Sequence, residues 1–581
     1  MSDPQLVLAA RVQAALAAAF GPSYADADPV IRPSSFADLQ ANVALPLAKK
    51  LGRKPREVAE EIVANLDTGG VVSDVQVSGP GFINLTLSDT WIAAEAQRAL
   101  EDERLAVPQV DKPQKVVVEY SSPNVAKEMH VGHLRTTIVG DAIARVLAFL
   151  GHDVVRDNHV GDWGTPFGML IEHLLDLGED AAARGDASVR DLTAFYQAAR
   201  LKFDGDEEFA DRSRRRVVAL QAGDAETLRL WNILVDVSKQ YFNDVYGRLG
   251  ITLTDDDIKG ESFYNDLLGP TVRELEDKGI AVVSEGALCA FPPGFTGREG
   301  EPLPVIIRKS DGGYNYSTTD LATIRYRVDT EHVDRMIYVV GTTQALHFQM
   351  VFAVARMAGW LDDDVRAEHA QIGNVLGTDG RLLRTRAGGT VKLSELLDEA
   401  VERAGVVFDE IQHDEPFDDA TRAEIVRDVG MGAVKYADLS VARDSEYIFD
   451  LDRMISFNGK TGPYLQYATA RIRSIFRKGG LDPRDATGPI VVGHPAERAL
   501  ALELLGFGAV LQQAGDTAEP HRLASYVYAV ADAYTTFYEN CPVLKAPDEE
   551  TKASRLALCA ATLRTLVTGL DLLGVPTPER M

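Results

Sequence analysis

The sequence predicts a multidomain protein with a central α/β domain, an N-terminal α+β domain and a C-terminal all-α helix bundle. The central domain is expected to contain a parallel sheet and a helical insertion. Three observations support this prediction. The chain has 581 residues, whereas one domain holds about 150, which suggests about four domains. A strand–loop–helix–strand pattern occupies residues 115–160, and after about residue 395 the pattern is almost wholly helical.

The N-terminal part, residues 1–112, mixes helical patterns with the strand-like stretch VSDVQVSGPGFINLTL and ends in a turn-rich segment. Short strands bounded by glycine and proline, next to amphipathic helices, are typical of an α+β domain. We therefore expect a separate domain and a linker here.

The central domain is predicted from a βαβ unit. KVVVEY, residues 115–120, is a short β-branched run that suits a buried strand. The apolar spacing over 131–151 predicts a helix with Gly151 as its stop signal, and HDVVRDNHV follows as a second strand. We therefore expect a Rossmann-like domain over residues 113–395, with its ligand at the carboxyl ends of the strands.

The rest of the chain is mainly helical. Residues of about 172–262 are charged and show no strand pattern, which predicts an insertion in the α/β domain. The α/β pattern returns in PVIIRKSDGGYNYSTTDLATIRYR, RMIYVVG and HAQIGNVLGTDGRLLRTRAGGT. We expect a helical stem over 396–455 and a helix bundle over 456–581, where long amphipathic segments recur.

The charge is strongly acidic but uneven. A net charge of −27 argues against a nucleic-acid partner, because phosphate binding needs clustered Lys and Arg. Residues 456–581, however, hold 13 Lys+Arg and 13 Asp+Glu. Basic clusters stand at Lys49–Arg56, Arg212–Arg216 and Arg471–Lys478. A solvated face is the ordinary explanation for each, yet such patches also permit nucleic acid held at a few places.

The cysteine and hydropathy patterns argue against disulfide-rich, zinc-binding and membrane-spanning proteins. The three cysteines are far apart and form no CxxC pair, which argues against a zinc knuckle and a disulfide framework. No segment approaches the ~20 apolar residues of a membrane span. We therefore expect a cytoplasmic protein with no membrane partner and no structural metal.

The loop SSPNVAKEMHVGH admits three explanations for its histidines. His130 and His133 share one helix face, but no HExxH glutamate or nearby cysteine completes a metal site. A packed core pair is the ordinary explanation for an isolated HxxH. The position favours a triphosphate cradle, because amide groups and the dipole at a helix N-terminus attract anions. Gly132 permits close approach to the backbone, and Lys127 adds a positive charge.

HVGH after the strand KVVVEY resembles the HIGH signature of class I aminoacyl-tRNA synthetases. The longer string VVVEYSSPNVAKEMHVGHLRTTIVGDAIAR resembles, more narrowly, arginyl-tRNA synthetases. So do DNHVGDWGTPFGML, GESFYND, RTRAGGTVKL, TGPYLQYATARIRSI and LLGVPTPERM, and the resemblance spans essentially the whole chain. It implies activation of L-arginine with ATP and Mg²⁺ to arginyl-adenylate and pyrophosphate, then transfer to the terminal adenosine of tRNA(Arg). It also implies a monomer that binds tRNA before activation.

The resemblance assigns catalysis to Lys127, His130 and His133, and ATP binding to these three together with Gly132, Arg384 and Arg386. The second family signature, KMSKS, is absent, and LLRTRAGG stands in its place at 382–389. The resemblance suggests that Lys127 takes over part of the binding of the phosphates. Which of the two arginines contacts pyrophosphate stays open, and a plain β-hairpin with a linker is the alternative for this loop.

The amino-acid pocket is expected to offer carboxylates, because a guanidinium stays charged and presents a planar fork of donors. The family pattern carries arginine binding over to Glu119, Asn124, Tyr316, Asp320 and Gln344. Asp320 and Tyr316 are expected at the guanidinium, and Asn124 and Gln344 at the α-amino and carboxylate end. Glu119 is open between the guanidinium and the ammonium. A strand-end salt bridge for Glu119 and core packing for Tyr316 are the alternatives.

The contacts with tRNA are expected at both ends of the chain. The C-terminal bundle is expected to bind the anticodon through stacking tyrosines and basic side chains: Tyr526, Tyr534, Arg471, Arg473, Arg477 and Lys478. Core packing is the alternative for the tyrosines, since most aromatic stripes on helices are buried. In the N-terminal domain, Gln40 and Asn42 are the expected base contacts.

Three other functions stay in view. A cysteinyl-type synthetase would require zinc-binding cysteines, and synthetases with large editing domains would require a far longer insertion. A small-molecule nucleotidyltransferase with an HxGH loop would need no C-terminal helical domain. A non-catalytic tRNA-binding paralogue is disfavoured because His130, Gly132 and His133 are intact.

Overall fold

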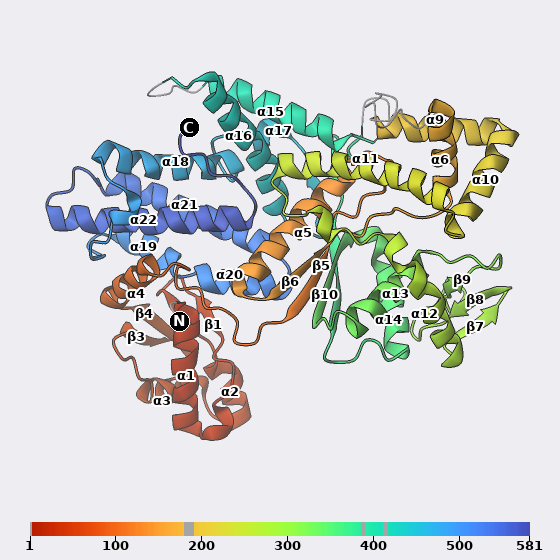
Figure 1. Cartoon of the computed structure of the whole chain (residues 1–581). Coiled ribbons are helices and arrows are strands. Elements are labelled where there is room, and N and C mark those ends of the chain that lie inside the picture. The colour runs from red at the N-terminus through yellow and green to blue at the C-terminus, as the bar shows by residue number, and fades with distance from the viewer. Residues whose placement is uncertain (1–2, 179–190, 385–389, 411–415) are drawn as a thin grey trace.

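The computed structural model describes residues 3–178, 191–384, 390–410 and 416–581. In Figure 1 the N-terminal region lies below the C-terminal helices, and the α/β region with its helical insertion lies beside both. This arrangement confirms the predicted fold class, whereas the domain boundaries stay predictions. Within the described ranges no helix is long and apolar enough to cross a membrane.

The N-terminal region packs helices against an antiparallel sheet of order β1-β2-β4-β3. The predicted strand stretch is the β3–β4 hairpin, and alternate residues of β4 (Ile83, Leu85 and Leu87) are buried, as expected for a half-buried strand. The elements are α1 (Pro4–Phe20), η1 (Pro22–Tyr24), β1 (Ile31–Pro33), β2 (Leu39–Ala41), α2 (Ala44–Leu51), α3 (Pro55–Ala64), β3 (Val72–Ser78), β4 (Phe82–Leu87) and α4 (Asp89–Glu101).

The central sheet is parallel, with the order β11-β10-β5-β6. Its strands are β5 (Lys115–Glu119), β6 (Asp153–Asp157), β10 (Arg335–Gly341) and β11 (Arg366–Ile372). Helix α5 (Val131–Leu150) leads from β5 to β6, and α14 (Ala345–Met357) leads from β10 to β11. The two crossovers run outward in opposite directions from the β5–β10 pair. Open parallel sheets bind ligands at such a switch point.

Both faces of this sheet are covered. Val116 and Val118 belong to the same core cluster as Leu134 of α5, whereas Val117 belongs to a second cluster with Val351 of α14. Strands buried on both faces have near-continuous apolar sequences. This double burial explains why KVVVEY lacks polar alternation.

The helical insertion follows β6 and consists of α6 (Pro166–Leu177), α9 (Leu192–Gly205), α10 (Glu207–Gln221) and α11 (Ala225–Leu249). The chain continues through η2 (Asp255–Asp257), η3 (Glu261–Tyr264) and α12 (Asn265–Asp277), and α13 (Tyr316–Asp329) precedes β10. Figure 1 shows α11 running alongside the top of the central sheet.

A second, antiparallel sheet of order β7-β8-β9 lies between α12 and α13. Its strands are β7 (Ala281–Ser284), β8 (Ala287–Ala290) and β9 (Val305–Arg308). The segment PVIIRK therefore forms a strand outside the parallel sheet. In β9, Val305 and Ile307 are buried while Ile306 is 40% exposed, the one-sided burial that is typical of antiparallel strands.

The C-terminal half is helical. It contains α15 (Leu393–Asp409), α16 (Asp419–Leu439), α17 (Leu451–Met454), α18 (Gly462–Gly479), η5 (Pro483–Asp485), α19 (Pro495–Leu504), α20 (Phe507–Thr517), α21 (His521–Asn540) and α22 (Glu549–Leu572). A short parallel pair, β12 (Val375–Leu376) and β13 (Tyr447–Ile448), connects the segment after β11 to the segment after α16.

Arginines connect the bundle to the other two regions. Arg335 at the start of β10 donates to Gly515 O at 2.9 Å and Asp516 O at 3.1 Å. Arg443 donates to Ala518 O at 3.0 Å. These cations meet the C-terminal end of α20, where exposed carbonyls and the helix dipole favour positive charge.

The N-terminal region docks on the bundle through Arg498 of α19. The guanidinium donates to both carboxylate oxygens of Asp38 at 2.8 Å and to Asp89 at 2.6 Å. A bidentate arginine–carboxylate pair fixes orientation as well as proximity. The two regions expected to contact tRNA are therefore held against each other.

Candidate active site and nucleic-acid interface

The loop between β5 and α5 leaves the sheet at its switch point in a strained conformation. Ser121, Ser122 and Ala126 have φ angles of 71°, 47° and 59°. A left-handed backbone destabilises a residue that has a side chain by roughly 1–3 kcal/mol. Such strain persists only where the surrounding structure holds the residue in place. Three strained residues so close together mark this loop as a functional candidate.

The two histidines cap the helix that follows the loop. His130 is the N-cap of α5, and its Nδ1 accepts from Gly132 N at 3.0 Å. Nδ1 of His133 accepts from His130 N at 3.1 Å, which completes a capping box. A Cβ at position 132 would stand 2.8 Å from His130 Cε1. Glycine at 132 is therefore required for this position of the His130 ring.

Both imidazoles are neutral at physiological pH. Burial and the charge of Lys127 lower the pKa of His130, and burial lowers the pKa of His133 to about 3. Since each Nδ1 accepts a backbone hydrogen bond, the hydrogen of the neutral ring is assigned to Nε2. The helix start therefore presents neutral N–H donors, which suit anionic oxygens.

A cavity of about 520 Å³ opens at the switch point beside His130. It lies between the start of α5, the end of β10 and the segment after β11, and its lining includes His130, Gly132, Gly341, Gly373, Asn374 and Arg384. The structure thus brings His130, Gly132 and Arg384 together. His133 is not among the lining residues, and its ring lies 4.0 Å from that of His130, centroid to centroid.

The segment after the expected second signature pairs with the first. Val131 N donates to Val391 O at 3.1 Å, and Leu393 N donates to Met129 O at 2.9 Å. Lys392 also forms an ion pair with Glu128 at 2.7 Å. Residues 390–393 therefore form an antiparallel pair with 129–131. The neighbouring Arg386 lies outside the described residues.

Lys127 lies on the outer side of the cradle. Its ammonium lies 4.4 Å from the ring centroid of Tyr196 in α9, a cation–π contact. Lys127 is exposed and does not line the cavity, although its charge acts on the pKa of His130.

A group of carboxylates lies around Asp320, which the sequence interpretation expects at the arginine guanidinium. Asp320 Oδ2 lies 2.6 Å from Nε2 of His347. The His347 ring in turn lies 4.9 Å from that of Tyr316, which is 61% exposed. Tyr316 and Asp320 are therefore connected through a residue that the sequence interpretation missed, although His347 follows Gln344 by only three positions.

Glu119 forms the strand-end salt bridge that was the alternative explanation for it. Arg327, fully buried, donates to Glu119 at 2.7 Å and to Asp157 at 2.8 Å. Glu119, Asp157 and His159 have possible ligand atoms within 4.8 Å of one another, but the guanidinium already bridges the two carboxylates. Burial and the nearby Asp320 carboxylate raise the pKa of Glu119, while Arg327 opposes this shift.

Glu261 is a further carboxylate of this group, and sequence reasoning did not assign it. Burial and the charges of Asp162 and Asp320 raise its pKa to about 7, and His159 opposes this shift. Burial is the main cause of this shift, and the like charges add to it, so a cationic ligand would favour the ionised form of Glu261. The quoted motif GESFYND contains Glu261, so a signal was present.

Asn124 and Gln344 are exposed residues near the ends of β5 and β10. Asn124 forms an isolated parallel bridge with Gly161, and a Cβ at 161 would stand 2.4 Å from Asn124 Oδ1. Glycine at 161 therefore leaves room for the Asn124 amide.

In the N-terminal region Gln40 is used within the sheet. Its amide donates to Asn84 Oδ1 at 2.7 Å across the β2–β4 pair. Asn42 is half-buried, and its Oδ1 has no hydrogen-bond partner among the residues that the structure describes. Between β1 and β2, Phe36 is 83% exposed and offers a stacking surface that sequence reasoning did not single out.

The bundle contains an aromatic and basic groove of about 710 Å³. Arg471 lies over the rings of Tyr467 at 4.8 Å and Tyr538 at 5.3 Å. The lining also includes Arg477, Lys478 and Arg580. Aromatic faces beside guanidinium groups suit unpaired bases and phosphates.

Three of the expected tRNA-binding side chains make their contacts inside the bundle. Tyr526 and Tyr534 are 6% and 0% exposed, because their side of α21 packs into the bundle core, and Tyr526 OH donates to Glu503 O at 2.9 Å. Arg473 is turned inward and donates to Thr577 O at 3.1 Å and Pro578 O at 2.9 Å. It therefore holds the C-terminal segment 576–581 against α18.

Comparisons with known families agree along the whole chain. Residues 95–451 match the family described as "tRNA synthetases class I (R), catalytic domain". Residues 465–581 match "DALR anticodon binding domain", and residues 6–87 match "Arginyl tRNA synthetase N terminal domain".

Individual proteins give the same result. The arginine–tRNA ligase of Thermobifida fusca is 65% identical over 581 residues, 100% of both chains, and that of Frankia casuarinae is 52% identical over 96% of each. The arginyl-tRNA synthetase structure from Plasmodium falciparum has a TM-score of 0.82 at 29% identity and covers 99% of both chains. The Thermus thermophilus structure has a TM-score of 0.81 at 26% identity and covers 99% of this chain and 100% of its own. These matches confirm the resemblance predicted from the motifs, and the chain belongs to the arginyl-tRNA synthetase family of class I aminoacyl-tRNA synthetases.

Proposed function

We propose that this chain joins L-arginine to tRNA(Arg) in two steps. Arginine is activated with ATP to arginyl-adenylate and pyrophosphate, and is then transferred to the 3′-terminal adenosine of the tRNA. The observation that carries this proposal is the capped His130 at the sheet's switch point, beside Arg384, in a chain 65% identical over its full length to an arginine–tRNA ligase.

In the first step the arginine carboxylate attacks the α-phosphate of ATP, which enters as its Mg²⁺ complex. No protein base is needed, because the nucleophile is already an anion. The protein's part is to position the reactants and to stabilise charge. The Nε2–H of His130, the amides at the start of α5 and the Arg384 guanidinium offer donors to the phosphates, and Lys127 adds charge at the rim.

The choice of arginine follows from the carboxylate group described above. Asp320, held by His347, would accept from the guanidinium together with Tyr316. Glu119, which Arg327 already pairs, lies in the same acidic group, and a cationic ligand would favour the ionised form of Glu261. Asn124 and Gln344, at the ends of neighbouring strands, would hold the α-amino and carboxylate end.

In the second step the 2′-hydroxyl of the terminal adenosine attacks the carbonyl of arginyl-adenylate, as class I membership implies, and AMP leaves. The groove around Arg471, Tyr467 and Tyr538 would receive the anticodon loop. The N-terminal region, with Gln40, Asn42 and the exposed Phe36, would contact another part of the tRNA.

These roles divide the chain as follows. We assign residues 1–112 to a domain that contacts tRNA and residues 113–395 to the catalytic domain, with an insertion at about 172–262. Residues 396–455 form a helical stem, and residues 456–581 form the anticodon-binding domain.

Charging of total tRNA with radiolabelled arginine tests the proposal, with lysine and glutamate as control amino acids. We expect ATP-dependent transfer of arginine alone to RNA. Transfer of a control amino acid, or no transfer of arginine by folded protein, would refute it.

A further inference from the structure

One helix of the insertion supplies hydroxyl groups to the strained loop before α5. Ser238 Oγ accepts from Ala126 N at 2.9 Å, and Tyr241 OH accepts from Met129 N at 3.2 Å. Ser238 is fully buried and donates its own hydrogen to Leu234 O at 2.8 Å. Its oxygen is therefore left as the acceptor for Ala126, one of the residues in the left-handed region.

Tyr246 of the same helix reaches the start of the loop. Its hydroxyl lies 2.7 Å from Ser121 Oγ and accepts from Asn158 Nδ2 at 3.0 Å. Ser121 Oγ lies 2.9 Å from Thr137 Oγ1, which donates to His133 O at 2.6 Å. A chain of hydrogen-bonded groups thus runs from α11 to the backbone of the histidine pair.

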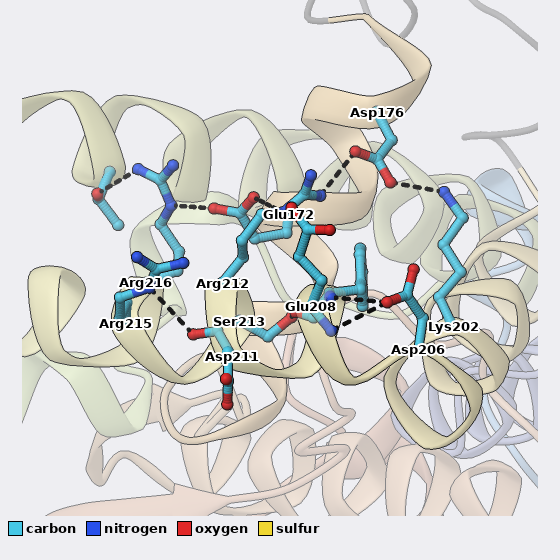
Figure 2. A network of polar contacts seen from close by, with 12 residues as sticks. Glu172, Asp176, Lys202, Asp206, Glu208, Asp211, Arg212, Ser213, Arg215 and Arg216 are labelled. Atoms are coloured by element: carbon cyan, nitrogen blue, oxygen red, sulfur yellow. Dashed lines mark hydrogen bonds and ion pairs between the residues drawn. The ribbon is translucent and has the colours of Figure 1, made fainter.

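The N-terminal end of α11 is anchored by a polar network inside the insertion (Figure 2). Glu172 of α6 pairs with Arg212 at 3.2 Å and Arg216 at 2.7 Å, and Arg216 also donates to Thr227 Oγ1 of α11 at 3.0 Å. Part of the basic cluster Arg212–Arg216 is therefore directed into the insertion and paired with acids. Helices α6, α10 and α11 are held together by these contacts.

The C-terminal end of α11 is anchored by the stem and by α5. The buried ammonium of Lys435 donates to Leu249 O at 2.6 Å, and Arg145 donates to Gly250 O at 2.8 Å. Cations at the final carbonyls stabilise a helix end. With both ends held, the middle of α11 is a fixed support for the loop.

We propose that Ser238, Tyr241 and Tyr246 are positioning residues for ATP-dependent activation. None of them lines the cavity beside His130, so they act by holding the loop that carries Lys127 and leads into His130. The proposal rests on the ATP-binding role proposed above for His130. It makes the helical insertion part of the activation machinery, because α11 connects the insertion to this loop.

The physical reason lies in the strain of the loop. Without the Ser238 oxygen, the amide of Ala126 is buried with no acceptor, and nothing at that point offsets its left-handed backbone. The loop then relaxes, and the donors that follow it lose their alignment with the phosphates. Misplacement by about 1 Å can cost 10²-fold in rate.

Ser238→Ala and Tyr246→Phe test this proposal, since each removes one oxygen and little volume. Arginine-dependent ATP–pyrophosphate exchange with tRNA present gives kcat and the KM values for ATP and arginine. Hydrogen–deuterium exchange of the segment 121–133 reports on the loop itself. The control is Tyr526→Phe, which removes a buried tyrosine hydroxyl of the bundle.

We expect kcat to fall roughly tenfold or more, an effect of misplacement, with the KM for arginine unchanged and the amides of Ala126 and Met129 exchanging faster. Ser238→Thr keeps the acceptor oxygen and should restore much of the rate. Should Ser238→Ala fail to fold, Tyr241→Phe removes a less buried hydroxyl from the same loop.

Wild-type kcat in folded Ser238→Ala and Tyr246→Phe, or an equal loss in Tyr526→Phe, would overturn the proposal. His130→Asn, measured in the same assay, separates this inference from the function on which it rests. A wild-type rate for His130→Asn removes the ATP-binding role itself. A slow His130→Asn beside a normal Ser238→Ala removes only the role of α11.

Discussion

At the scale of single residues, the His130 imidazole has two separable functions. Nδ1 accepts from Gly132 N and closes the start of α5, whereas Nε2–H is left as a neutral donor beside the cavity. An alanine substitution would therefore remove a helix cap and a phosphate donor together. A side chain that keeps only the cap distinguishes the two.

His130→Asn is that substitution. Asparagine is among the best N-cap residues, so its side-chain oxygen can accept from Gly132 N and the thermal stability should stay close to wild type. The imidazole donor is lost, and removal of one such donor costs roughly 10² in rate. We expect this loss in ATP–pyrophosphate exchange, with circular dichroism as the control for folding. A normal rate would exclude His130 from the phosphate site.

The second residue-scale prediction concerns the pH dependence of stability. Burial lowers the pKa of His133 to about 3 in the folded chain, whereas the unfolded value is about 6.5. Below pH 6.5 the unfolded chain takes up a proton that the folded chain does not, so stability is lost as the pH falls from 6.5 toward 3. At pH 5 this single group costs about 2 kcal/mol.

Urea unfolding of wild type and His133→Asn at pH 7 and pH 5 measures this contribution. Asparagine does not titrate in this range, so the loss of unfolding free energy between the two pH values should be smaller in the variant. The same loss in both proteins would show that His133 is not held neutral by burial.

At the scale of elements, helix α18 carries two kinds of arginine. Arg471 lies over aromatic rings in the groove, whereas Arg473, two positions on, holds the C-terminal segment 576–581. Arg580 and Met581 of that segment line the groove. Arg473 therefore shapes the groove from behind without facing it.

Arg473→Met should release that segment and weaken tRNA binding. We expect the KM for tRNA to rise by roughly tenfold, which corresponds to about 1.4 kcal/mol of binding, while the KM values for ATP and arginine at saturating tRNA stay the same. Arg484→Met serves as the control, because it removes an equal charge from the same bundle. In the described structure Arg484 pairs only with the nearby Asp482. An unchanged KM for tRNA in Arg473→Met would contradict this role.

The elements that sequence predicted well are those whose pattern is local. The helix expected over 131–151 is α5, Val131–Leu150, with Gly151 as its left-handed C-cap. The run KVVVEY contains β5, since burial on both faces removes polar residues. The capped histidines were placed at a helix start because the boundary between strand, loop and helix is visible in the sequence.

The residues whose surroundings could not be predicted are those whose position depends on tertiary packing, which the sequence of a single helix does not specify. Tyr526 and Tyr534 satisfy a helical spacing equally well inside or outside a bundle, and only the neighbouring helices decide that they are buried. Arg473 turns inward because a distant segment folds back over α18. His347 and Glu261 join the carboxylate group through segments that are far apart in sequence.

At the scale of the whole molecule, the N-terminal region and the bundle meet where α4 packs against α19 and α22, and arginines of the bundle cross this junction. Arg498 provides the bidentate pair with Asp38, and Arg564 donates to Asp102 O at 2.7 Å. If both regions bind one tRNA, this junction sets the separation of the two contacts.

Arg498→Met should loosen this junction. Asp38, whose side chain is 13% exposed, would lose its cationic partner, and a largely buried polar group left unpaired costs about 1–3 kcal/mol. We expect a larger radius of gyration in small-angle scattering and a higher KM for tRNA, with adenylate formation retained at saturating tRNA. Arg11→Met, which breaks a pair with Asp67 within the N-terminal region, should change neither quantity. Identical scattering profiles for Arg498→Met and wild type would refute the prediction.

The hydrogen bonds of Arg335 and Arg443 to the end of α20 have a consequence for which RNAs the protein can bind. These side chains extend from β10 and from the segment after α16 to carbonyls of the bundle, so the cavity at His130 and the groove at Arg471 stand at a constant distance. A ligand that fills both must have its reactive end and its loop separated by that length. The overall dimensions of an RNA thereby become a criterion of recognition in their own right, one that applies to every base sequence equally.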